Sequence, residues 1–64
     1  MMIMVFCLET NEEFYFVADN GEEAINKMLY TLNVSHKDRN AKIQLINNRT
    51  WSLEHGGKTY SCKA

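Results

Sequence analysis

The chain opens with two apolar runs that have the composition of β-strands. Residues 2–8 and 13–18 are rich in β-branched and aromatic side chains, and polar residues separate them. We expect a hairpin with a two-residue loop, at either residues 10–11 or residues 11–12. Both loops give the same faces, because side chains along a strand point alternately to opposite sides. The residues expected on one face are Ile3, Val5, Cys7, Phe14, Phe16 and Ala18.

The next segment changes to a helical period. Over residues 22–32, apolar side chains recur at the i, i+3, i+4 and i+7 positions of a helix. These side chains are Ile25, Met28, Leu29 and Leu32. Asn20 predicts the N-cap, and Glu23 follows it at the spacing of a capping box. Asn33 predicts the left-handed residue that ends the helix.

The C-terminal part predicts three more strands, the first over residues 42–46. Gly56 and Gly57 favour a type I′ turn between the last two strands, because glycine accepts positive φ at both central positions. The alternation of apolar and polar residues agrees with this turn. The predicted pairs are Trp51 with Cys62 and Leu53 with Tyr60 on one face, and Ser52 with Ser61 and Glu54 with Thr59 on the other.

The order of these elements predicts one small α+β domain over residues 1–64. Its architecture is ββαβββ, an antiparallel sheet with one helix packed on one face. A chain of 64 residues buries only about 60% of the surface that it exposes when unfolded. We therefore expect a marginal stability, to which a partner, a disulfide or an oligomer would add.

One helix covers one face of a sheet, and this leaves surplus apolar residues in the first hairpin. The C-terminal strands have a polar second face, whereas both faces of the first hairpin are apolar. Parity leaves open which of its two apolar sets is buried, and the set that we expect to face outward is Met4, Phe6, Leu8, Tyr15 and Val17. Contiguous exposed apolar side chains mark interfaces, so we predict that this face binds a protein partner or a second copy. An open alternative is that the C-terminal residues curl over it.

Charge is unevenly distributed along the chain. Residues 1–32 hold six acidic residues and one basic residue, and residues 33–64 hold six basic and two acidic residues. The basic half makes nucleic-acid binding the main alternative function. Its candidate contacts are Lys37, Arg39, Lys42, Arg49 and Lys58. Two observations oppose it: Trp51 and Tyr60, the aromatic candidates for stacking, share the core-facing parity, and the sequence pI is only about 6.0.

The sequence does not favour catalytic or metal chemistry. His36 and His55 are the only bases that titrate near neutral pH, and we expect both in loops. Ser35, beside His36, is better explained as a cap than as a nucleophile. Cys7, Cys62 and the two histidines are the candidate ligands of a zinc site. They lack the closely spaced ligand pairs of a zinc finger. We therefore predict a protein that is not an enzyme and needs no cofactor or metal.

The two cysteines also bear on the compartment. The apolar run at residues 1–8 is too short to span a bilayer and lacks the flanks of a signal peptide. We accordingly expect a cytoplasmic protein, without membrane contact, in which Cys7 and Cys62 are free buried thiols. A disulfide between them stays open as an alternative, if the first and last strands are neighbours.

Two segments resemble parts of known proteins. The strand-to-helix junction FVADNGEEA, over residues 16–24, looks like the corresponding junction of small phage and prophage proteins. The closing GKTY, over residues 57–60, is similar to their terminal hairpins. The resemblance implies a small protein that binds and modulates a host protein, and it assigns no functional residue.

Overall fold

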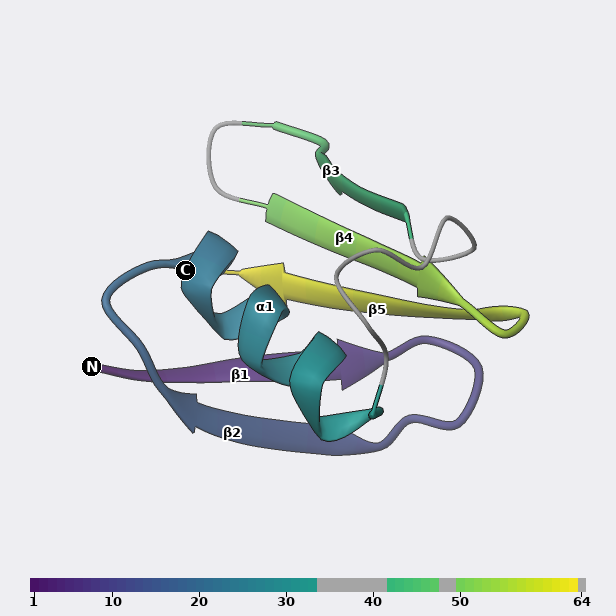
Figure 1. The fold of residues 1–64 in the computed structure, drawn as a ribbon, viewed down its shortest axis with the longest axis horizontal. Helices are drawn as coiled ribbons and strands as arrows, with labels where there is room; N and C mark the ends of the chain where they lie inside the picture. Colours follow the sequence, from purple (N-terminus) through teal and green to yellow (C-terminus); the bar gives the residue numbers. More distant parts are fainter. Residues whose placement is uncertain (34–41, 48–49, 64) are drawn as a thin grey trace.

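The computed structural model describes residues 1–33, 42–47 and 50–63. Its elements are β1 (Met2–Cys7), β2 (Glu13–Val17), α1 (Gly21–Thr31), β3 (Lys42–Leu45), β4 (Thr50–His55) and β5 (Lys58–Lys63). The strands form one antiparallel five-stranded sheet in the order β2-β1-β5-β4-β3. Figure 1 shows α1 lying across this sheet. The predicted α+β class is therefore confirmed.

The core lies between α1 and the face of the sheet that we call the inner face. Ile25 and Met28 of α1 are fully buried there, in the same cluster as Val5 of β1 and Leu53 of β4. These are the apolar positions that the helical and strand periods select. The helix contacts β1, β2, β4 and β5, so it packs across most of the sheet.

Both ends of α1 follow the predicted capping chemistry. The Glu23 backbone N–H donates to Asn20 Oδ1 at 2.9 Å, and Asn20 is the N-cap. Asn33, just beyond the C-cap, has a φ of 61°, as predicted for a left-handed residue. The helix begins at Gly21 and ends at Thr31, one residue earlier at each end than the periodicity indicated. On its exposed side, Lys27 Nζ lies 3.5 Å from Glu23 Oε1.

The first hairpin has the predicted faces but a different register. Ile3 lies opposite Phe16 and Val5 opposite Phe14, and both pairs belong to the inner face. The Cys7 N–H donates to the Glu12 carbonyl, and the Asn11 N–H donates to the Cys7 carbonyl. The connection is therefore the four residues 8–11. Because its length is even, the parity of the side chains is unchanged.

The prediction of a two-residue loop in this hairpin was wrong, and for the loop at residues 10–11 the reason is steric. A type I′ loop needs positive φ at both central residues, and a β-branched residue such as Thr10 resists that conformation. The longer loop needs one left-handed residue, which Asn11 supplies with a φ of 63°. Asparagine is among the residues that adopt this conformation most readily.

The last hairpin has the predicted register in full. Trp51 pairs with Cys62 and Leu53 with Tyr60, while Ser52 faces Ser61 and Glu54 faces Thr59. Gly56 and Gly57 have φ values of 61° and 76°, as a type I′ turn requires. His55 is the last residue of β4, so its predicted place in a loop is wrong. His36 lies outside the described residues.

The sheet order joins the two ends of the chain at its centre. Val5 of β1 lies opposite Cys62 of β5, so the first and last strands are neighbours. Cys7 and Cys62 are nevertheless free, and both are buried, as expected for core thiols. The first hairpin forms one edge of the sheet, and β3 forms the other (Figure 1). The acidic and basic halves of the sequence thus supply different edges.

Candidate functional site: the outer face of the first hairpin

The face of the sheet that turns away from α1, here called the outer face, carries exposed apolar side chains in the first hairpin. The exposed fraction is 53% for Leu8, 59% for Tyr15 and 64% for Val17. Met4 and Phe6 lie between them and are half-buried. All five residues predicted to face outward therefore do so. Their alternate neighbours Ile3, Val5 and Cys7 are the buried set, because α1 covers only the inner face.

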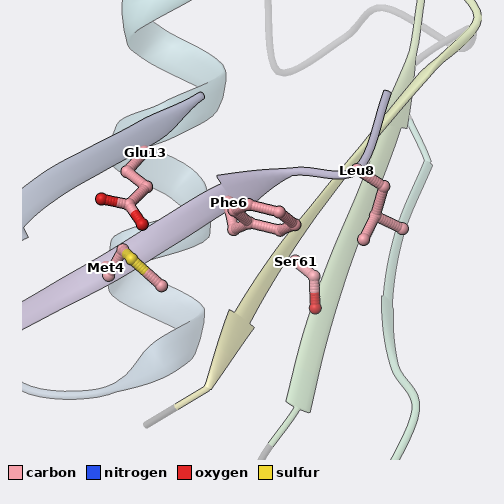
Figure 2. Close-up of a pocket in the computed structure, with 5 residues that line it drawn as sticks. All are labelled: Met4, Phe6, Leu8, Glu13 and Ser61. Atoms are coloured by element: carbon pink, nitrogen blue, oxygen red, sulfur yellow. The ribbon is translucent and has the colours of Figure 1, made fainter. Parts of the chain in front are cut away.

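A shallow depression of about 340 Å³ lies within this surface. It is lined by Met4 and Phe6 of β1 and by Leu8, which follows β1 (Figure 2). Glu13 of β2 and Ser61 of β5 complete the lining. Both flank Phe6 because each lies opposite it in a neighbouring strand. The lining of the depression thus combines three apolar side chains with one carboxylate and one hydroxyl.

Sequence reasoning missed the place of Glu13 in this site. Its position depends on the register of the first hairpin, and the expected two-residue loops paired Phe6 with a different residue. Ser61 was correctly placed on the polar face of β5. That Ser61 lies next to Phe6, however, depends on the pairing of β1 with β5, and this pairing joins residues far apart in the sequence.

Tyr15 holds the Glu13 carboxylate beside the depression. The Tyr15 hydroxyl donates to Glu13 Oε1 at 2.9 Å. This hydrogen bond, together with the nearby negative charge, raises the pKa of Tyr15 above its ordinary value, because both favour the protonated phenol. The exposed Tyr15 side chain is therefore held beside the carboxylate that lines the depression.

The loop after β1 is tied to β5 next to Leu8. The Leu8 N–H donates to the Thr59 carbonyl at 2.9 Å, and the Thr59 N–H donates to Glu9 Oε1 at 2.7 Å. The second bond stabilises the ionised carboxylate, so it lowers the pKa of Glu9. These two bonds fix the end of the depression to the centre of the sheet.

The described residues place few reactive groups together. Among them, no set of three or more His, Cys, Asp or Glu side chains is arranged to hold a metal ion. Cys7 and Cys62 lie in the core, and burial raises the pKa of the Cys62 thiol. Neither thiol lines the depression. The candidate catalytic neighbours Ser35 and His36 lie outside the described residues.

The basic residues of the nucleic-acid alternative are only partly described. Lys37, Arg39 and Arg49 lie outside the described residues. Lys42 and Lys58 are exposed, but they do not share a face. Lys42 lies opposite Glu54 on the outer face, whereas Lys58 has the inner parity of Tyr60.

The aromatic candidates for base stacking belong to the inner face. Tyr60 is buried in the core, and Phe14 meets its ring edge-on at a centroid distance of 6.3 Å. Trp51 is half-buried and packs against the same cluster. Both residues therefore contribute to packing, as their parity predicted.

Comparisons of this chain with protein-family models, with curated proteins and with solved structures find no match. Within the part of the chain that the structure describes, no helix has the length and apolar character needed to cross a membrane.

Proposed function

We propose that this protein is a non-enzymatic protein-interaction module that binds a protein partner through the outer face of its first hairpin. The observation that supports the proposal is the continuous apolar surface of β1 and β2, with a depression of about 340 Å³ inside it. Exposed apolar patches on small soluble domains often mark interfaces, because burying them on binding releases ordered water.

The composition of the surface favours a protein over a small molecule as the ligand. A small-molecule site surrounds most of its ligand and directs several polar groups toward it. Here the apolar side chains spread over two strands of an exposed sheet face, with Tyr15 and Val17 beyond the depression. A partner side chain would fill the hollow as an anchor, while Glu13 and Ser61 would form part of the polar rim.

We further propose that the module acts in the cytoplasm and that its partner is a host-cell protein. The two free buried thiols support a reducing compartment. The resemblance of the strand-to-helix junction and of the terminal hairpin to small phage proteins supports a host protein as the partner.

A capture experiment with matched variants tests the proposal. Nuclease-treated bacterial lysate is incubated with the tagged wild-type protein and with the variants Phe6→Ser, Tyr15→Ser and Gln44→Ser. The mass of each purified chain in solution is also determined, which gives its oligomeric state. Gln44 is an exposed outer-face residue on β3, so its replacement serves as the control. We expect a stoichiometric protein that is captured by the wild type and by Gln44→Ser and is lost with Phe6→Ser and Tyr15→Ser.

Capture that persists in both first-hairpin variants would contradict the proposed surface. Tyr15 is more than half exposed, so Tyr15→Ser is not expected to unfold the domain. Circular dichroism of each variant verifies this. Captured material that disappears at high salt and depends on Lys42 or Lys58 would instead favour nucleic-acid binding.

A further inference from the structure

Strand β2 is an open edge of the sheet. The Ala18 N–H donates to the Met1 carbonyl, and the Glu12 carbonyl accepts from Cys7. In an antiparallel pair, the main chain of every second residue faces the neighbouring strand. On this side of the chain, Glu12, Phe14, Phe16 and Ala18 therefore face β1. The main-chain groups of Glu13, Tyr15 and Val17 therefore point away from β1, toward the open side.

This edge has little of the protection that edge strands usually carry. Natural proteins block such edges with proline, bulges or charged side chains. On β2, Lys27 Nζ donates to the Val17 carbonyl and so occupies one outward acceptor. Among the described residues, none bonds to the outward N–H and C=O of Tyr15. Phe14 and Phe16 are half-buried on one side of the strand, and Tyr15 and Val17 are exposed on the other.

We propose that β2 pairs antiparallel with β2 of a second copy of this chain, about a twofold axis at Tyr15. The inference concerns the edge of the sheet and does not depend on the proposed function of the outer face. The sequence of β2, EFYFV, is nearly palindromic about Tyr15. Self-pairing therefore places Tyr15 opposite Tyr15, and Phe14 opposite Phe16 of the second copy, and such aromatic cross-strand pairs are stabilising.

The charges at the ends of the shared edge agree with this register. Glu13 comes opposite Val17 of the second copy, at the end where that copy's Lys27 lies on the Val17 carbonyl. There Lys27 occupies the acceptor that the Glu13 N–H of the other copy would use. The two Glu13 residues stand at opposite ends of the pair, roughly 13 Å apart along the strands, so like charges are separated.

The test removes one outward donor without changing a side chain. A 64-residue chain is within reach of total chemical synthesis, so the Tyr15 amide nitrogen can be methylated. The matched control carries the methyl on the Leu45 nitrogen. The Ile46 N–H donates to the Thr50 carbonyl, so the Leu45 N–H, one residue away, faces the open side of β3, the opposite edge.

Sedimentation equilibrium over a concentration series gives the dimer dissociation constant of each chain. We expect the wild type to dimerise, N-methyl-Tyr15 to dimerise at least about tenfold more weakly, and N-methyl-Leu45 to match the wild type. Lys27→Ala frees the Val17 carbonyl and should tighten the dimer severalfold. In the wild type, hydrogen exchange at the Tyr15 amide should slow as the protein concentration rises.

A wild-type chain that stays monomeric up to about 1 mM would overturn the proposal. So would a dimer that survives methylation of Tyr15 unchanged, since its contact would lie elsewhere. Methylation leaves the Tyr15 ring in place, so partner capture by the outer face should persist in N-methyl-Tyr15. Loss of the edge dimer and loss of the outer-face interaction are therefore distinguishable.

Discussion

The two hairpins of this sheet hold their strands together in different ways. In the β4–β5 hairpin, two glycines with positive φ make a tight turn, and apolar residues alternate with polar ones. In the β1–β2 hairpin, a four-residue loop uses Asn11 as its left-handed residue, and both faces are apolar. The last hairpin thus buries nearly all its apolar residues beneath α1, whereas the first hairpin leaves a second apolar set exposed.

The comparison separates apolar residues that stabilise the fold from apolar residues that the fold does not need. A polar outer face is sufficient for the fold, as β4 and β5 demonstrate. The apolar outer face of β1 and β2 adds little to the core, because Leu8, Tyr15 and Val17 stay more than half exposed. Surplus apolar surface of this kind is the observation that supports the proposed interaction.

The largest expected effect distinguishes buried from exposed apolar residues of the two hairpins. Leu53 of β4 is fully buried, and Leu53→Ala should lower the free energy of unfolding by about 2–5 kcal/mol. Leu8, which lines the depression, is 53% exposed, and Leu8→Ala should change the free energy of unfolding by less than about 0.5 kcal/mol. Urea unfolding of both variants measures the contrast, and similar losses would contradict the division into inner and outer faces.

A smaller effect is expected at the turn of the last hairpin. Gly57 has a φ of 76°, and a Cβ added there would meet no atom within 4 Å. Gly57→Ala should therefore lower the free energy of unfolding through backbone strain alone, by about 1–2 kcal/mol. Gly57→Asn should lower the free energy of unfolding by less, because asparagine tolerates this conformation. Thermal unfolding compares the two, and an equal loss would show that strain is not the cause.

The smallest expected effect concerns the tie between the two hairpins. The pKa of Glu9 is lowered by the Thr59 N–H, so its ionised form stabilises the fold above the unfolded pKa. This contribution is lost as the pH falls through the lowered folded value. Glu9→Gln should thus be slightly less stable than the wild type near neutral pH, and the difference should shrink as the pH falls through the lowered pKa of Glu9. Unfolding over a pH series measures the difference, and one that persists in acid would exclude the carboxylate as its source.

The features of the fold that could be predicted from sequence are those with local causes. The helix followed from the spacing of Ile25, Met28 and Leu29, and its start from Asn20. The register of the last hairpin followed from Gly56 and Gly57, because turn chemistry and alternation agree there. Parity sorted the residues of the first hairpin into two faces, and the structure shows which face α1 buries.

What could not be predicted depends on residues that are distant in sequence or on an ambiguous turn. Two-residue loops at residues 10–11 and at residues 11–12 gave the same faces of the hairpin. Neither of them paired Glu13 with Phe6. The pairing of β1 with β5, which brings Ser61 to the same side chain, has no local signature. Strand order depends on which apolar surfaces α1 can cover together, and that is a property of the whole fold.

The central place of β5 has a consequence for how the chain becomes a folded protein. β5 lies between β1 and β4, and no pairing between β1 and β4 joins the two sides of the sheet without it. On the ribosome, the first hairpin and α1 emerge long before the strand that connects them to β4. Because β5 follows all the other strands in the sequence, the sheet can close only after residues 58–63 have been made. Until then, the edge of β1 that pairs with β5 is open to any chaperone or partner that is present during synthesis.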